Sequence, residues 1–315
     1  MSRPLPKVIA DGPLSVPTLE LLDGKVELLP WETLLGEANE TIDGIYTFGH
    51  PRLDGVLMDK VPNIKVISNY GVGVDHIVLE DAKERGIPVS NTPGVLDGAT
   101  ADLGFCLLMM AARRLGEGIR LARSPEFSEY QPARLLGREV HGAKLGIVGL
   151  GRIGQQVARR ANGFDMEVSY YNRNRRIDME NILGISYQSF DELLSSSDYV
   201  MLCVPLSSET NGLIGAAELR MMSPNAILVN IARGGVVDTD ALTLALTESW
   251  IYGAALDVTE PEPLPRDHPL LNLDNAIITP HLGSATVQTR QKMSELSVKN
   301  LLLGLAGEPL SHPVL

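Results

Sequence analysis

The sequence has few cysteines and no long hydrophobic run. Only two cysteines, Cys106 and Cys203, occur in 315 residues, so the chain cannot be built on a framework of several disulfides. Each lies in an apolar run, and we expect both to be thiols packed in the core rather than nucleophiles or disulfide partners. The longest apolar run, Leu103 to Ala112, is too short to cross a bilayer and predicts a buried helix.

Signals for export, metal binding and nucleic-acid binding are also missing. The N-terminal stretch MSRPLPKVIA lacks the apolar core of a signal peptide, so the cytoplasm is the expected location. The six histidines show no ligand spacing such as H-x-x-x-H, and we predict no metal site. A net charge of −12 and a pI near 5.0 argue against a nucleic-acid surface. The charged fraction of 21% and the hydrophobic fraction of 44% are those of a globular protein, and we predict no membrane or nucleic-acid partner.

Short apolar strands alternate with helices in both halves of the chain. This rhythm predicts an α/β protein with two doubly wound parallel sheets. The predicted strands are 7–10, 26–29, 44–48, 64–68, 87–90, 145–148, 168–171, 186–188, 199–204, 226–231, 253–257 and 276–279, and the predicted helices are 17–22, 81–85, 99–114, 155–160, 191–195, 217–222, 239–247 and 286–306.

Two stretches suggest how the chain divides into domains. Residues 92–100 join the two halves. The long helix 99–114 comes next, followed by a second amphipathic piece up to about Ala122 and by the polar, irregular residues 124–131. The final helix, 286–306, carries Lys292, Glu295 and Lys299 on one polar face. We expect it to return and pack on the first domain.

The stretch from Lys144 to Gly154 combines a strand with the glycine spacing of a dinucleotide-binding turn. Its sequence KLGIVGLGRIG places Gly149, Gly151 and Gly154 directly after the strand. The first glycine allows a tight turn, the second lets a diphosphate approach the backbone, and the third lets the next helix pack closely. The N-terminus of that helix offers N–H groups to the phosphates. This context favours dinucleotide binding over a glycine-rich turn without a ligand.

The residues after the next strand indicate which dinucleotide binds. NAD-binding proteins of this fold place an Asp or Glu there to hold the adenosine ribose. Here the chain reads Asn172-Arg173-Asn174-Arg175-Arg176 instead. Arginine pairs with a 2′-phosphate, which a carboxylate would repel. We therefore predict NADPH as the preferred cofactor, with NADH possible and with Asn172 and Arg173 as the first contacts; a solvated basic turn is the alternative.

A second glycine-containing loop, Asn69 to Asp75, follows a strand in the first half. Its sequence NYGVGVD contains Gly71 and Gly73, which expose backbone N–H groups to a bound molecule. The loop is either an anion cradle for a small substrate carboxylate or a tight turn between strand and helix. The residues of the loop alone do not separate these alternatives.

Three strand-end loops of the second half present charged or titratable side chains. Arg233 follows the strand 226–231, three acids (Asp257, Glu260 and Glu262) follow the strand 253–257, and His281 follows the strand 276–279. Carboxyl ends of parallel strands line the ligand crevice in a doubly wound sheet. Reduction of a 2-keto acid there needs a proton donor, which His281 can be. Glu262 would orient the imidazole, and Arg233 would bind the substrate carboxylate and polarise the carbonyl.

Several motifs together resemble the D-isomer-specific 2-hydroxyacid dehydrogenases over nearly the whole chain. They are GLGRIG (149–154), NIARG (230–234), LDVTEPEPLP (256–265) and TPHLGSAT (279–286), with YGVGVDH (70–76) and NTPGVL (91–96). Within the family, residues 256–309 look most like glyoxylate/hydroxypyruvate reductases, and the NRNR segment looks like the NADPH-preferring members. The resemblance implies reduction of small 2-keto acids, such as glyoxylate and hydroxypyruvate, to D-2-hydroxy acids.

The resemblance also implies an architecture and a set of site residues. A Rossmann coenzyme domain, 97–284, is inserted into a flavodoxin-like substrate-binding domain, 1–96 and 285–315, and two copies form a homodimer through their coenzyme domains. Arg233, Glu262 and His281 are the implied catalytic set, with the amides of Val72 and Gly73 on the substrate carboxylate. Asp257 is implied on the nicotinamide carboxamide. We further expect Ser284 at the substrate, and Arg152, Ile153, Asn174, Arg175, Val204, Pro205, Thr210, Ile231 and Ala232 at the cofactor.

One segment departs from the family pattern. Mammalian-type glyoxylate reductases carry tryptophans before the dinucleotide turn, one of which reaches toward the partner's active site, whereas this chain reads SPEFSEYQP (124–132). Phe127 or Tyr130 is the candidate replacement, and Trp31 and Trp250 lie elsewhere as packing residues. Bulkier 2-keto acids, such as 2-ketogluconate and hydroxyphenylpyruvate, therefore stay open as substrates.

A corepressor that senses the dinucleotide is a further alternative, but the chain shows no disordered tail and retains a full acid–base set.

Overall fold

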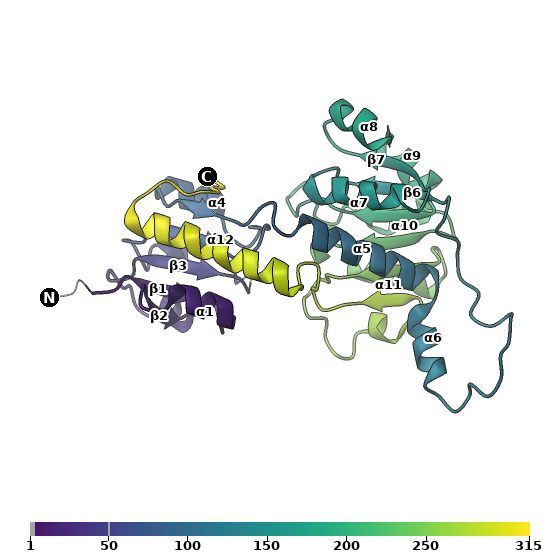
Figure 1. The fold of residues 1–315 in the computed structure, drawn as a ribbon, viewed down its shortest axis with the longest axis horizontal. Coiled ribbons are helices and arrows are strands. Elements are labelled where there is room, and N and C mark those ends of the chain that lie inside the picture. The colour runs from purple at the N-terminus through teal and green to yellow at the C-terminus, as the bar shows by residue number, and fades with distance from the viewer. Residues whose placement is uncertain (1–3, 50) are drawn as a thin grey trace. The chain divides into compact units, whose positions relative to one another are not determined.

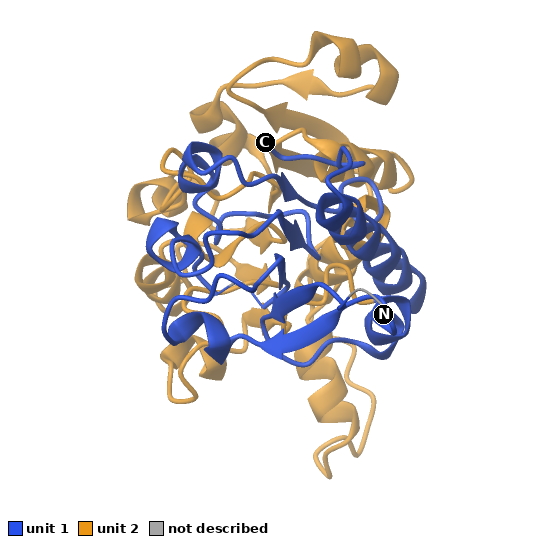
Figure 2. Cartoon of the chain, turned by 90° about the vertical axis from the view of Figure 1, so that its left-hand side faces the viewer, with its two compact units in different colours: residues 1–96, 286–315 blue, residues 97–285 orange. Residues whose placement is uncertain are grey.

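The computed structural model describes residues 4–49 and 51–315. His50 and the first residues of the N-terminal stretch lie outside this range. The chain forms two compact units, residues 1–96 with 286–315 and residues 97–285 (Figure 2). Ala285, expected in the first unit, belongs to the second, because its N–H bonds the carbonyl of Leu282 in the turn that ends the His281 loop.

The first unit contains a five-stranded parallel sheet with the order β2-β1-β3-β4-β5 (Figure 1). This is the flavodoxin order. The long helix α12 packs on α1 and β4, and the hydroxyl of Tyr46 on β3 lies 2.8 Å from that of Ser297 on α12. The strands are β1 Lys7–Ala10, β2 Glu27–Pro30, β3 Gly44–Thr47, β4 Val66–Asn69 and β5 Val89–Ser90, and the helices are α1 Val16–Leu22, α2 Glu32–Leu35, α3 Gly55–Met58, α4 Leu79–Glu84 and α12 Val287–Ala306.

The second unit contains a seven-stranded parallel sheet with the order β12-β11-β10-β9-β6-β7-β8. The order reverses between β6 and β9, which is the switch point of a Rossmann fold. The strands are β6 Lys144–Val148, β7 Glu167–Tyr171, β8 Ser186–Tyr187, β9 Tyr199–Leu202, β10 Ile227–Asn230, β11 Gly253–Leu256 and β12 Ala276–Ile278. The helices are α5 Asp97–Ala112, α6 Leu115–Ala122, α7 Arg152–Asn162, α8 Ile177–Leu183, α9 Phe190–Ser196, α10 Ala216–Met221 and α11 Thr239–Thr247, with 3-10 turns η1 Gly234–Val236 and η2 Pro269–Asn272. The two predicted doubly wound sheets are confirmed.

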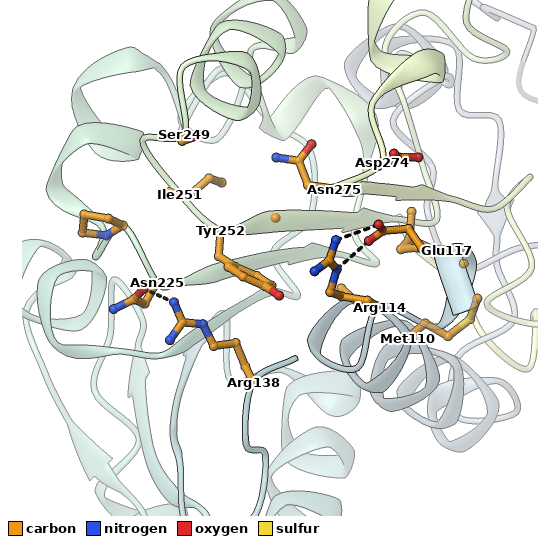
Figure 3. A pocket seen from close by; sticks show the side chains of 15 residues that line it. Met110, Arg114, Glu117, Arg138, Asn225, Ser249, Ile251, Tyr252, Asp274 and Asn275 are labelled. Atoms are coloured by element: carbon orange, nitrogen blue, oxygen red, sulfur yellow. Dashed lines mark hydrogen bonds and ion pairs between the residues drawn. The ribbon is translucent and has the colours of Figure 1, made fainter. Parts of the chain in front are cut away.

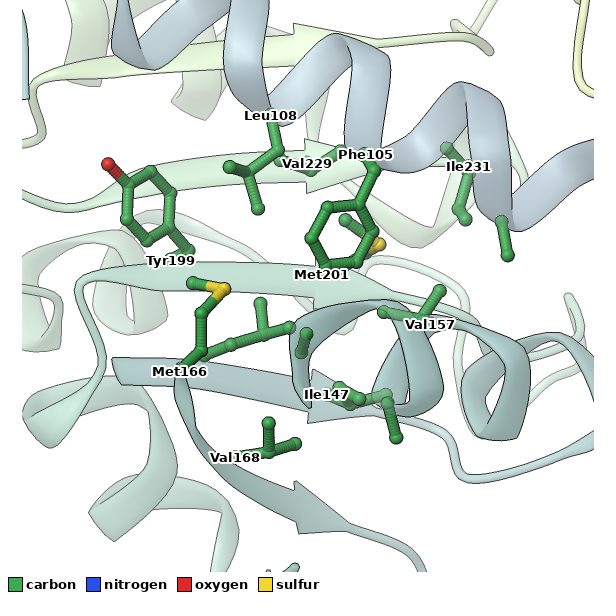
Figure 4. Close-up of a cluster of buried hydrophobic side chains, with 14 of the residues drawn as sticks. Phe105, Leu108, Ile147, Val157, Met166, Val168, Tyr199, Met201, Val229 and Ile231 are labelled. Carbon is green, nitrogen blue, oxygen red and sulfur yellow. The ribbon is translucent and has the colours of Figure 1, made fainter. Parts of the chain in front are cut away.

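One core of the second unit lies between α5 and the sheet (Figure 4). Phe105 and Leu108 of α5 point toward Met201 of β9 and Val229 of β10. The opposite face of α5 is in contact with solvent, and Cys106 lies on it, exposed. The expectation that Cys106 is a core thiol is wrong, because an apolar helix that covers one face of a sheet still turns part of its surface outward.

Cys203, the second cysteine, follows β9 and packs against the same core. Desolvation raises the pKa of its thiol to about 12, so the thiol is neutral and a poor nucleophile.

The irregular character expected for 124–131 is confirmed, since these residues form neither helix nor strand. None of the helices in the described part of the chain is long and apolar enough to span a bilayer.

Candidate active site

The glycine turn between β6 and α7 is built for close backbone approach. Gly149 has φ +102°, and a Cβ there would lie 2.8 Å from Val204. A Cβ on Gly154 would lie 2.2 Å from the carbonyl oxygen of Gly149, so the helix can pack against the turn only with glycine. Gly151, the N-cap of α7, has open space at its Cβ position and no side-chain cap. The first N–H groups of α7 therefore fit the diphosphate of a dinucleotide.

Several of the predicted cofactor residues beside this turn make hydrogen bonds, ion pairs or packing contacts within the second unit. The side-chain oxygen of Asn172 accepts a hydrogen bond from the Leu150 N–H at 2.6 Å, which leaves the amide nitrogen as a donor. Arg152 pairs with Asp97 of α5 at 2.9 Å, and Ile153 packs on the core. Asn174 is exposed.

Arg173, Arg175 and Arg176 each lie beside a carboxylate. Arg175 forms a bidentate pair with Glu180 at 2.7 and 2.8 Å, and Glu180 also accepts the hydroxyl of Tyr170 at 2.8 Å. The guanidinium of Arg175 lowers the pKa of Glu180 to about 2. Arg173 instead pairs with Glu209 in the loop after β9, and both side chains are largely exposed.

The remaining predicted cofactor residues line the ends of β9 and β10. The hydroxyl of Thr210 donates to the carbonyl of Pro205 at 2.6 Å and accepts the N–H of Ser207 at 2.9 Å, which closes the loop after β9. Val204 and Ala232 are partly accessible, and Ile231 is buried. Of these two strands, β9 borders the switch point, where ligands of doubly wound sheets bind.

The loops after β11 and β12 bring His281 and Glu262 together. His281 Nδ1 lies 2.8 Å from Glu262 Oε1, and about a third of each side chain is exposed. A carboxylate acceptor at Nδ1 fixes that nitrogen as the protonated one, and Nε2 is the second ring nitrogen through which an imidazole can exchange a proton. Glu260, one of the other acids of this segment, is exposed, and its carbonyl accepts the hydroxyl of Thr239 at 2.7 Å.

Asp257 holds the loop that carries His281. Its carboxylate, only 2 % exposed, accepts hydrogen bonds from the Thr279 hydroxyl and the N–H groups of Leu282 and Gly283, each at 2.7 Å. The Asp257 carbonyl accepts the His281 N–H at 2.9 Å. His281 has φ +55°, a conformation that costs an ordinary residue about 1–2 kcal/mol. The four hydrogen bonds to Asp257 offset this strain. The expected contact of Asp257 with the nicotinamide carboxamide stays a prediction.

Arg233 is positioned by the asparagine at the end of β10. Asn230 is 1 % exposed, and its amide donates to the Arg233 carbonyl at 2.9 Å and accepts the Ala232 N–H at 3.0 Å. The next residue, Gly234, touches the following loop so closely that a Cβ would lie 2.0 Å from the Thr259 carbonyl oxygen. The Arg233 loop is thereby packed against the loop of Glu262.

The predicted substrate residues Val72 and Gly73 lie in the first unit, in the loop after β4, and are partly accessible. Ser284 lies in the second unit, directly after the His281 loop, and is also partly accessible. Their contact with a substrate stays a prediction.

A cavity of about 410 Å³ lies elsewhere in the second unit, at the amino ends of β10, β11 and β12 (Figure 3). Arg114 in this cavity pairs with Glu117 at 2.7 Å, and Arg138 bonds Asn225 and lies 4.8 Å from the ring of Tyr252. The catalytic candidates follow the opposite, carboxyl ends of the same strands. This cavity is therefore separate from the candidate active site. No cluster of three or more metal-ligating side chains occurs in residues 4–49 and 51–315.

Comparison with known proteins adds an independent line of evidence. The family described as "D-isomer specific 2-hydroxyacid dehydrogenase, NAD binding domain" matches residues 105–283. A glyoxylate reductase of Pyrococcus furiosus is 43% identical over 314 residues, which cover 96% of this chain and 93% of that protein. A glyoxylate reductase of Thermococcus gammatolerans is 46% identical over 284 residues, or 89% and 84% of the two chains.

Two solved structures have the same fold over nearly their whole length. An NADPH-dependent glyoxylate/hydroxypyruvate reductase of Sinorhizobium meliloti, in complex with NADP and malonate, has a TM-score of 0.90 at 32% identity and covers 98% of this chain and 96% of its own. A D-lactate dehydrogenase of Aquifex aeolicus, complexed with NAD and lactic acid, has a TM-score of 0.87 at 30% identity and covers 98% of both.

Proposed function

Because the chain belongs to the D-isomer-specific 2-hydroxyacid dehydrogenase family and is therefore an NAD(P)-dependent oxidoreductase acting on CH–OH groups, we propose that it reduces glyoxylate and hydroxypyruvate to glycolate and D-glycerate with NADPH. The observation that carries this proposal is the His281–Glu262 pair at 2.8 Å on a loop fixed by Asp257. Such a pair is the acid that reduction of a carbonyl requires.

The bound cofactor supplies a hydride to the carbonyl carbon of the substrate. His281, protonated, donates the proton at Nε2 to the carbonyl oxygen, so that one hydride and one proton convert the carbonyl group of the 2-oxo acid to the alcohol. Glu262 stabilises the imidazolium before transfer and keeps the ring in orientation afterwards. Arg233 binds the substrate carboxylate and polarises the carbonyl. The amides of Val72 and Gly73, and Ser284, complete the contacts with the substrate.

The preference for NADPH rests on the chain after β7. No carboxylate follows Tyr171 to repel a 2′-phosphate, and Arg173 lies there, exposed, with Asn172 before it. NADH remains a weaker substrate on this proposal, because the glycine turn and the loops after β9 and β10 hold the parts that both cofactors share.

We also propose that two copies associate through the second unit. Large apolar side chains are exposed along α6 and the segment that follows it, and burial of such side chains on a partner is favourable. Phe127 and Tyr130 belong to this segment.

A steady-state comparison tests the function. NADPH and NADH are each assayed with glyoxylate, hydroxypyruvate, 2-ketogluconate and hydroxyphenylpyruvate. We expect the highest kcat/KM with NADPH and the two small acids. A higher kcat/KM for either bulky acid would replace the substrate assignment, and dinucleotide binding without turnover of any acid would favour the corepressor alternative.

The substitution His281→Ala tests the proton donor in the same assay. We expect kcat to fall by about 10²- to 10⁴-fold, the usual contribution of a positioned acid, while the Kd for NADPH stays unchanged. His141→Ala is the matched control, since His141 is an exposed histidine of the same unit that lies beside Asp165. An unchanged kcat in His281→Ala would remove the assignment.

A further inference from the structure

Four consecutive carbonyl groups in the loop after β4 are bonded to side chains and backbone of the first unit. The Tyr70 carbonyl accepts the Thr92 hydroxyl at 2.7 Å. The Gly71 carbonyl accepts the amide of Asn69 at 2.9 Å and the Thr92 N–H at 3.1 Å. The Val72 carbonyl accepts the amide of Asn91 at 2.8 Å, and the Gly73 carbonyl accepts the amide of Asn69 at 2.8 Å.

The orientation of Asn69 is determined by its surroundings. The side chain is fully buried, and its nitrogen faces two carbonyls, which only an N–H donor can satisfy. Its oxygen accepts the hydroxyl of Thr47 at 3.0 Å, and that hydroxyl lies 3.2 Å from Nε2 of the buried His76. Because the hydroxyl proton is used on Asn69, His76 Nε2 must donate to Thr47. A directed chain from His76 through Thr47 thus orients the Asn69 amide toward the loop.

The bonded carbonyls determine where the N–H groups point. In a trans peptide the N–H of each residue points opposite to the carbonyl of the residue before it. Carbonyls of residues 70–73 that face the protein therefore turn the N–H groups of 71–74 away from it. Within residues 4–49 and 51–315, the amides of Gly71, Val72 and Gly73 have no hydrogen-bond acceptor. Outward, adjacent N–H groups form an anion site.

From this geometry we propose that Asn69 and Asn91 are positioning residues that set the affinity for the substrate carboxylate. They act through the loop peptides and do not touch the substrate themselves. Asn69 fixes the Gly71–Val72 and Gly73–Val74 peptides, and Asn91 fixes the peptide between Val72 and Gly73. This inference rests on the proposed function, since it names the groups that keep the amides of Val72 and Gly73 ready for a carboxylate.

The test compares wild type with Asn69→Leu, which keeps the branched shape of the side chain but has no hydrogen-bond donor, and with Asn91→Ala. Asn63→Ala is the control, because Asn63 also donates to a loop carbonyl of this unit, that of Glu40 at 2.9 Å. Loss of two bonds that preorganise the loop should raise KM for glyoxylate about tenfold or more in Asn69→Leu, and loss of one about threefold in Asn91→Ala. KM for NADPH should stay within about twofold of wild type, since the cofactor binds the second unit.

A binding measurement provides a readout besides turnover. Oxalate has the size of glyoxylate and cannot be reduced, so its Kd for the enzyme saturated with NADP⁺, measured by calorimetry, should rise in parallel with KM. A parallel rise of KM for glyoxylate and for NADPH, or wild-type oxalate binding in a folded variant, would overturn the proposal. If Asn69→Leu does not fold, Asn91→Ala decides the outcome. Failure of wild type to reduce glyoxylate would contradict the proposed function, whereas oxalate binding would still test the roles of the asparagines.

Discussion

Buried polar side chains at the ends of strands hold the loops of the candidate site. Asn69 ends β4, Asn230 ends β10 and Asp257 directly follows β11, and each bonds the backbone of a site loop. Removal of one side chain from such a buried hydrogen bond is costly, because the backbone group that it bonded is then left without a donor or water. Each loop is therefore fixed from within its own unit, before any ligand binds.

In the basic segment after β7, neighbouring carboxylates determine which arginine can bind a 2′-phosphate. Arg175 is held by two bonds to Glu180, which Tyr170 also binds. Arg173 has a single exposed partner, Glu209, and such surface pairs contribute about 0–1 kcal/mol. Arg173 can leave Glu209 for a 2′-phosphate at little cost, whereas Arg175 cannot leave Glu180 so easily.

We therefore expect Arg173→Ala to raise KM for NADPH about tenfold, the value of one charge-assisted contact, and to change KM for NADH little. Arg175→Ala is the matched control from the same segment; it should raise KM for NADPH less, because Glu180 already holds the Arg175 guanidinium through two bonds. Initial-rate measurements with both cofactors decide this. An equal rise for NADPH and NADH in Arg173→Ala would show that the contact is not with the 2′-phosphate.

The sequence predicted Arg233, Glu262 and His281 because residues after strands meet at one edge of a parallel sheet. It did not predict the roles of Asn69, Asn91 and Asn230. Asparagine is common in any loop, and which carbonyl its amide reaches depends on neighbours that are distant in sequence, such as Thr47 for Asn69. The NIARG motif and the asparagine before YGVG were the available signals.

At the scale of elements, α12 is joined to the first sheet through a glycine. A Cβ on Gly304 would lie 2.4 Å from Val66 of β4, so the helix approaches the strand more closely than any other residue allows. Buried Met293, Val298 and Leu301 extend the same contact face of α12. Residues 91–286 separate the helix from the last strand of this sheet, yet the helix is as much a part of the first unit as the strands are.

The substitution Gly304→Ala should destabilise the first unit by about 1–3 kcal/mol, the cost of overpacking, although alanine favours a helix by about 1 kcal/mol over glycine. Gly118→Ala in α6 is the control, because its nearest neighbour lies 4.0 Å from the added Cβ; it should be neutral or stabilising. Urea unfolding followed by circular dichroism measures both. Equal stability of wild type and Gly304→Ala would show that the helix can move away from Val66 without cost.

The strands of both sheets were predictable, whereas the helices α2, α3 and α8 were not predicted. Every strand of both sheets overlaps a predicted one, since apolar runs between turn residues are distinctive. The helices α2 and α3 have only four residues each, too few for a helical period to show, and they were not predicted. The exposure of Cys106 was missed because α5 is apolar nearly throughout, and only the position of the sheet decides which side is buried.

At the scale of the whole molecule, α6 and the segment that follows it expose a group of large apolar side chains. These side chains are Leu115, Ile119, Phe127, Tyr130 and Leu136, between 43% and 83% exposed. The segment projects from the second unit as an irregular loop (Figure 1). A chain with a net charge of −12 repels its copies at long range, so association requires apolar burial of this kind.

We expect wild type to sediment as a dimer and Ile119→Glu to sediment as a monomer at micromolar concentration, because a carboxylate buried without a partner costs several kcal/mol. Ile182→Glu is the matched control, since Ile182 is 67% exposed on α8 of the same unit and should leave the dimer intact. Sedimentation velocity distinguishes the two masses. If Ile182→Glu dissociates the dimer and Ile119→Glu does not, the interface lies on α8; if wild type is a monomer, the proposed association through the second unit is wrong.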